Sequence, residues 1–230
     1  MALCAPVITI LGIIISSYAL SYTKELYMYK YLRKVFFIHL AVGILWGIYT
    51  SLLIVGADIY MESWPLSFLA SILFAFEVIF FTHGNIKEAL ERVLPSSERC
   101  IYIPVILMSL TLMAQGIVLT PGIAIAIAFA GFVFALIIEL IYSVSQIYSI
   151  MRGGRLFYFW RKMILLSIGY IIYGLTYSIA GIMTMTQIIP YGLGNLLVAI
   201  FYTAKSVLIY DLMSYYQRSL KPLLEKLGRT

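Results

Sequence analysis

Four ionisable side chains lie inside long apolar runs of this sequence: Glu77, Glu139, Lys205 and Asp211. A charged side chain at the centre of a membrane helix costs about 2.5 to 3.5 kcal/mol on insertion scales, so each of these residues is a site candidate. Glu139 and Asp211 fall near one end of their runs, where a carboxylate can reach lipid head groups. We assign them a structural role or a place on a proton or ion path.

Glu77 and Lys205 lie deeper than the other two. Counted from one end of their runs, they are about 12 and 14 residues in, which is a similar depth at a rise of about 1.5 Å per residue. Two interpretations stay open: the pair is a buried structural ion pair, or it is a reactive centre. In the second case burial favours the neutral amine of Lys205, a nucleophile that can form a Schiff base with an aldehyde, and Glu77 is its counterion.

His39 and His83 form a second constellation, near one end of neighbouring runs. A bis-histidine haem needs two facing imidazoles, and a chain that moves electrons across a bilayer needs a second such pair, which this sequence lacks. We therefore favour a hydrogen-bonding or proton-handling role over haem or a metal. No phosphate-binding glycine loop, catalytic triad spacing or zinc motif supports an enzyme.

The runs that hold these residues are long enough to cross a bilayer. The chain is 63% hydrophobic and 11% charged, with a mean hydropathy of +0.99, which is typical of membrane proteins. A spanning helix needs about 20 mostly apolar residues. We expect an all-α protein with a single transmembrane domain of seven helices. The expected spans are residues 5–22, 34–56, 65–84, 101–119, 122–149, 163–187 and 191–213, with a basic amphipathic tail at 214–230.

The cations of the chain are confined to alternate connections. Of the 16 lysines and arginines, all but Lys205 lie between spans 1 and 2, 3 and 4, 5 and 6, or after span 7. The positive-inside rule makes that side cytoplasmic, which predicts a multi-pass cell-membrane protein with the N-terminus outside and the C-terminus inside. The net charge of +6 then reflects topology and contact with the lipid bilayer, and not a nucleic-acid partner.

An internal repeat is visible at a shift of about 128 residues. This shift places Arg33-Lys34 on Arg161-Lys162, and Glu77 on Lys205. The predicted plan is a repeat over about 5–84, a linker helix at about 101–119, and a parallel repeat over about 122–213. Parallel repeats occur in membrane transporters, which hold their sites near the repeat interface. We therefore expect spans 3 and 7 to lie side by side.

The last two spans carry a resemblance to a known family. Seven helices, an outer N-terminus and the run Leu196 to Lys205, with Pro190 just before it, resemble the microbial rhodopsins. The resemblance implies that Lys205 binds retinal as a Schiff base with Glu77 as counterion. It also implies a pocket of aromatic side chains, formed by Trp46, Tyr170, Tyr173, Tyr177 and Tyr202. Phe201 stands where the family usually has a carboxylate, four residues before the lysine, which argues against a conventional outward proton pump.

Three functions follow from these patterns. The first is a divergent retinal-binding protein that acts as a light sensor or a weak ion mover. The second is a retinal-free transporter or channel component, with Glu77, Lys205 and Glu139 along a polar path. The third is a structural subunit of a larger membrane complex, in which Glu77 and Lys205 are simply paired. Partners beyond lipid are a second copy of the chain or other membrane subunits.

Overall fold

The computed structural model describes residues 4–23, 30–55, 155–185 and 188–226, together with positions 66, 69, 70, 73, 74, 76–78, 80, 81 and 84. These residues form helices and no strands. The helices are α1 (Cys4–Tyr22), α2 (Lys30–Ile54), α6 (Arg155–Met185), α7 (Tyr191–Tyr215), the π-helical turn η2 (Tyr216–Leu220) and α8 (Lys221–Lys226). The described positions between 66 and 84, here called segment 66–84, are helical as well. The expected spans 101–119 and 122–149 lie outside the described residues.

Three of the described helices are long and apolar enough to cross a membrane. They are Cys4–Tyr22, Tyr31–Ile54 and Gly192–Lys226. Helix α6 is 31 residues long and begins eight residues before the expected span 163–187, because its first turns carry Arg155, Arg161 and Lys162, which a search for apolar runs leaves out. The chain also stays helical after Tyr215 through η2 and α8. The backbone therefore stays helical from the expected span 191–213 into the expected basic tail at 214–230.

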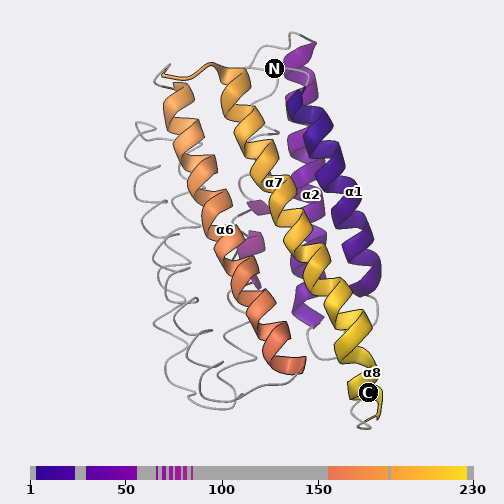
Figure 1. Cartoon of the computed structure of the whole chain (residues 1–230). Coiled ribbons are helices and arrows are strands. Elements are labelled where there is room, and N and C mark those ends of the chain that lie inside the picture. The colour runs from indigo at the N-terminus through magenta and orange to yellow at the C-terminus, as the bar shows by residue number, and fades with distance from the viewer. Residues whose placement is uncertain are drawn as a thin grey trace.

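Side-chain contacts fix the directions of the helices. Thr203 donates to the carbonyl of Ile8 and Gln217 donates to the carbonyl of Tyr22, so α1 and α7 run parallel. Helix α6 runs the opposite way, because Lys162 near its start pairs with Asp211 near the end of α7. Helix α7 packs against both α6 and α1, and α1 also packs against α2 (Figure 1).

Helix α1 has its small residues inside and its large residues outside. Its buried side is made of Ala5, Pro6, Thr9, Gly12, Ser16 and Ala19. Its exposed side carries Val7, Ile10, Leu11, Ile14 and Tyr18. Small residues let membrane helices approach closely, while large apolar residues are at no disadvantage against lipid tails. This distribution is the reverse of a soluble helix and agrees with a helix surrounded by lipid.

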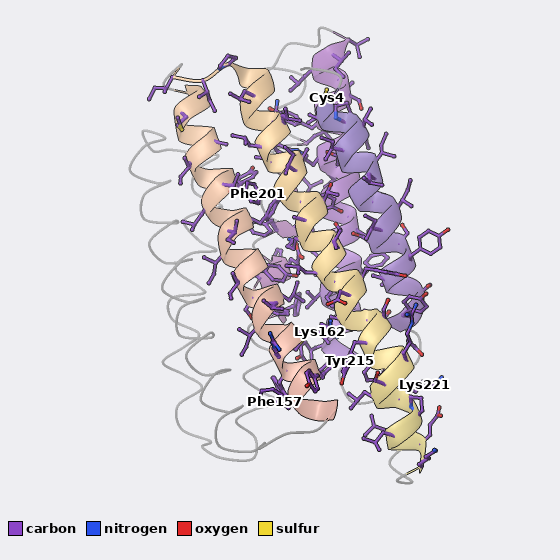
Figure 2. All side chains as sticks on the ribbon, viewed as in Figure 1. Cys4, Phe157, Lys162, Phe201, Tyr215 and Lys221 are labelled. Atoms are coloured by element: carbon purple, nitrogen blue, oxygen red, sulfur yellow. The ribbon has the colours of Figure 1, made fainter. Side chains whose placement is uncertain are left out.

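Apart from Lys205, the described cations gather at one end of the helices. Arg33 and Lys34 lie at the start of α2, Arg161 and Lys162 near the start of α6, and Arg218 beyond the end of α7. Figure 2 shows Phe157, Lys162 and Lys221 near this end and Cys4 near the opposite end. No lysine or arginine lies at the opposite end among the described residues. The structure therefore brings the sequence-separated basic clusters together on one side.

Candidate functional site

The centre of the bundle holds a buried ion pair between Glu77 of segment 66–84 and Lys205 of α7. Lys205 Nζ lies 3.1 Å from Glu77 Oε1 and 3.1 Å from Oε2, and donates a hydrogen bond to each. Both side chains have 0% exposure. The structure thus brings into contact two residues that the sequence placed at a similar depth. Both charges are shielded from solvent, and each is balanced by the other. Both carboxylate oxygens also accept a hydrogen bond.

Three aromatic rings enclose the Lys205 ammonium. Its Nζ lies 4.4 Å from the ring centroid of Tyr173, 4.5 Å from that of Tyr170 and 4.8 Å from that of Phe74. The face of an aromatic ring carries negative potential and attracts a cation within about 6 Å of the ring centroid. The phenol of Tyr170 also donates a 2.5 Å hydrogen bond to Glu77 Oε1. The ammonium is therefore surrounded by one carboxylate and three rings, which we call the Lys205 cage.

His39 of α2 connects Glu77 to a chain of hydroxyl groups. His39 Nδ1 lies 3.1 Å from Glu77 Oε1, at an angle that makes this contact electrostatic and not an aligned hydrogen bond. On the other side of the ring, Nε2 lies 2.9 Å from Ser206 Oγ, and Ser16 of α1 donates to Ser206 at 2.9 Å. All of these side chains are buried. One polar chain thus joins segment 66–84, α2, α7 and α1.

Each hydroxyl in that chain has a choice of acceptor. Ser206 lies 3.0 Å from the carbonyl of Tyr202 and 2.9 Å from His39 Nε2. Ser16 lies 2.8 Å from the carbonyl of Gly12 and 2.9 Å from Ser206 Oγ. A hydroxyl has one proton to donate and accepts through its oxygen. The chain can therefore reverse its direction when the two hydroxyls rotate and the His39 imidazole carries its proton on Nε2, which is the property a proton relay needs.

Tyr202 holds His39 in place, and two glycines make room for it. The Tyr202 ring stacks on the His39 imidazole with centroids 4.6 Å apart, and its hydroxyl donates to the carbonyl of His39 at 3.2 Å. A Cβ at Gly43 of α2 would overlap the hydroxyl end of Tyr202, and a Cβ at Gly12 of α1 would lie 2.8 Å from its ring. The close approach of α1, α2 and α7 around the site therefore depends on these glycines.

A row of aromatic rings leads away from the Lys205 cage. Phe74 meets Tyr173 edge-on with centroids 4.8 Å apart, and Phe74 and Tyr177 lie 6.4 Å apart. Tyr177 in turn meets Trp46 at 5.6 Å. The indole Nε1 of Trp46 is buried and has no hydrogen-bond partner among the described residues. The five aromatic residues proposed as pocket lining thus lie around Lys205, next to His39, or along this row.

Asp211 lies apart from the centre. It is half-exposed and pairs with Lys162, whose ammonium lies over the ring of Tyr215 at 5.6 Å from its centroid. Figure 2 shows Lys162 and Tyr215 close together near the basic end of α6 and α7. Six residues separate Asp211 from Lys205, or about 9 Å along the helix. Glu139 and His83, the other residues proposed for an ion path, lie outside the described residues.

Sequence reasoning did not join His39 to Glu77 and Lys205, and it missed Phe74, Ser206 and Ser16. Helical spacing carried part of the signal. Phe74 precedes Glu77 by three residues, and Ser206 follows Tyr202 by four, so each shares a helix face with a residue already chosen. No helical spacing links Ser16 to a residue already chosen, because its role depends on which helix lies beside α7.

The described residues contain no group of three or more histidine, cysteine, aspartate or glutamate side chains that could hold a metal ion. No family model, no curated protein and no solved structure matches the chain.

Proposed function

We propose that this protein is a retinal-free membrane transporter that moves protons through the Glu77, Lys205 and His39 centre. The observation that carries the proposal is the hydrogen-bonded chain from His39 through Ser206 to Ser16, which begins at the 3.1 Å contact between His39 and Glu77. A carboxylate, an imidazole and hydroxyls in contact are the groups that proton pathways in membranes use. Helix dimensions place Lys205 about 21 Å from the start of α7, within the apolar part of the bundle.

The proposed orientation follows the cations. Arg33, Lys34, Arg161 and Arg218 occupy the end that we assign to the cytoplasm, in a multi-pass cell-membrane protein with its N-terminus outside. His39 lies five residues from Lys34, about 8 Å along α2. The centre therefore lies closer to the cytoplasmic end, and a proton from that side has the shorter distance to travel.

Proton flux into liposomes tests the proposal. Protein is reconstituted around a pH-sensitive dye, a pH gradient is applied, and the flux is compared with that of empty liposomes. We expect the wild type to conduct protons, and we expect the proton flux of Glu77→Gln to be at least tenfold lower. Asp211→Asn is the matched control, because it also removes one carboxylate but at a half-exposed position, and it should keep the flux. A wild type no faster than empty liposomes contradicts the proposal and favours a structural subunit.

Retinal binding at Lys205 is the second candidate, because a lysine beside a carboxylate and flanked by Tyr170 and Tyr173 is the arrangement a protonated Schiff base needs. It ranks second for a chemical reason. The ammonium donates hydrogen bonds to both carboxylate oxygens, whereas a protonated Schiff base has a single N–H. A polyene must also displace at least one ring that lies against Nζ.

Incubation with all-trans retinal separates the two candidates. The retinal-free proposal expects no visible absorbance beyond that of free retinal, whether Lys205 is present or replaced by alanine. A band that forms in the wild type and in Lys162→Ala but is lost in Lys205→Ala would replace the proposal with the retinal-binding alternative. Lys162 is the suitable control because it is also a lysine with a carboxylate partner, at the basic end of the bundle.

A further inference from the structure

We infer that the Lys205 cage is the binding site for an organic ammonium cation, which takes the place of the Lys205 ammonium beside Glu77. This inference rests on the proposed transport function and names its substrate class. Its basis is the composition of the cage: one carboxylate with both oxygens at 3.1 Å from Nζ, and three rings with centroids 4.4 to 4.8 Å away.

The rings are what distinguish the cage from a simple ion pair. A carboxylate alone neutralises a buried lysine, and aliphatic side chains would serve equally well to fill the space around it. Here the Phe74, Tyr170 and Tyr173 rings lie against the ammonium, and these residues are 6% exposed or less. Aromatic faces around a desolvated cation form the arrangement that selects organic ammonium groups over hydrated inorganic ions. The cage is therefore built for the kind of group that ends a lysine side chain.

Lys205 occupies the cage as a cation tethered to α7. Glu77 is the only carboxylate in contact with the ammonium among the described residues, and one negative charge balances one positive charge. A substrate ammonium and a charged Lys205 therefore exclude each other. When the substrate enters, Lys205 gives up one proton, which ends on water outside the bundle, and becomes a neutral amine, so the charge of the centre does not change. One proton leaves for each cation bound.

A chain of groups that can carry the released proton lies beside the cage. The chain from His39 through Ser206 to Ser16 begins in contact with Glu77. The titratable groups that face Lys205 are Glu77 from segment 66–84, His39 from α2, and Tyr170 and Tyr173 from α6. Loss of a proton from Lys205 on binding means that cation affinity rises as pH rises. Coupled to proton movement, the same exchange makes the protein a proton–cation antiporter.

Methylammonium is the appropriate probe, because it reproduces the end of the Lys205 side chain and stays protonated near neutral pH. Isothermal titration of the purified wild type in two buffers of different ionisation enthalpy measures affinity and proton release together. We expect binding that tightens with pH and a release of about one proton per methylammonium. Phe74→Leu, which removes a ring but no titratable group, should weaken binding about threefold to 30-fold.

Variants at Lys205 provide the second measurement. Lys205→Ala should bind methylammonium more tightly than the wild type, without proton release, and should gain thermal stability when it binds. The double variant Lys205→Ala/Glu77→Gln should neither bind methylammonium nor gain thermal stability from it. If methylammonium restores the thermal stability of Lys205→Ala but does not bind the wild type, the inference is overturned. Lys205 is then a permanent occupant of the cage. Binding without proton release, or no binding to either protein, overturns it as well.

The two proposals fail separately. If the proton flux depends on Glu77 but methylammonium does not change it, the antiport inference is wrong and the proposal of proton transport stands. Methylammonium binding in a protein whose flux is the same as that of empty liposomes removes proton transport and leaves a cation-binding site.

Discussion

Replacing Lys205 with methionine isolates the contribution of the buried ion pair. Methionine has nearly the length of lysine and no charge, so among the described residues only Tyr170 and His39 then remain in polar contact with Glu77. Removing one partner of a buried pair costs about 3 to 5 kcal/mol, because the remaining charge is uncompensated. The Tyr170 hydrogen bond of 2.5 Å and the uptake of a proton by Glu77 itself offset part of that cost. We expect a net loss of about 3 kcal/mol.

Thermal unfolding in detergent measures this loss. For a chain of this size about 3 kcal/mol corresponds to a fall in Tm of roughly 6 to 12 °C. The deficit should shrink at lower pH, because a protonated Glu77 no longer carries an unpaired charge. The double variant Lys205→Met/Glu77→Gln should recover most of the loss, since replacing both partners of a buried pair is often neutral.

Lys162→Met is the matched control for this experiment. Lys162 also pairs with a carboxylate, but its side chain is 26% exposed and that of Asp211 is 50% exposed, so its loss should cost less than about 1 kcal/mol. The reasoning is refuted if Lys205→Met unfolds at the same temperature as Lys162→Met. It is also refuted if the double variant is as unstable as Lys205→Met alone.

Three further experiments, on a hydrogen bond, on helix packing and on topology, test neighbouring parts of the account. Tyr170→Phe removes one charge-assisted hydrogen bond to the carboxylate and should cost about 1.5 to 3 kcal/mol in the same unfolding assay; no change in Tm would mean that this phenol does not bind the carboxylate. Gly43→Ala drives a Cβ into the ring of Tyr202 and should cost about 1 to 3 kcal/mol. Gly169→Ala meets only the flexible tip of a leucine and should cost less; equal losses would contradict the proposed packing. Cys4 is exposed at the N-terminal end, so with the other cysteine replaced it should react with an impermeant maleimide on intact cells, and labelling only after permeabilisation would reverse the topology.

The placement of Glu77 and Lys205 at one depth on neighbouring helices could be predicted because it depends on few assumptions, whereas their contact could not. A charge in an apolar run needs a partner, and the residue count from the ends of the runs gave both side chains a similar depth. The repeat shift of 128 residues is also the separation of the two residues in the sequence. None of these arguments requires knowledge of how the other helices are ordered.

The rest of the site could not be predicted, because it depends on helix order and rotation. His39 was placed near one end of its span together with His83, and nothing in the sequence turns its ring toward Glu77. Ser16 contributes only because α1 lies against α7, and serines in apolar helices commonly bond to their own backbone, as Ser17 does to Ile13. The helix ends could not be predicted either, because a hydropathy pattern marks where the apolar stretch ends and not where the backbone stops being helical.

Infrared spectroscopy of the Glu77 side chain tests the central claim most directly, which is that Glu77 and Lys205 are both charged inside the bundle. The C=O stretch of a protonated carboxylic acid is separate from the bands of an ionised carboxylate. At neutral pH we expect no acid band from Glu77 in the wild type, so Glu77→Gln should leave that region of the spectrum unchanged. Lys205→Met should create a new acid band that disappears in Lys205→Met/Glu77→Gln. A wild-type acid band that Glu77→Gln removes would show a neutral Glu77 and contradict the ion pair.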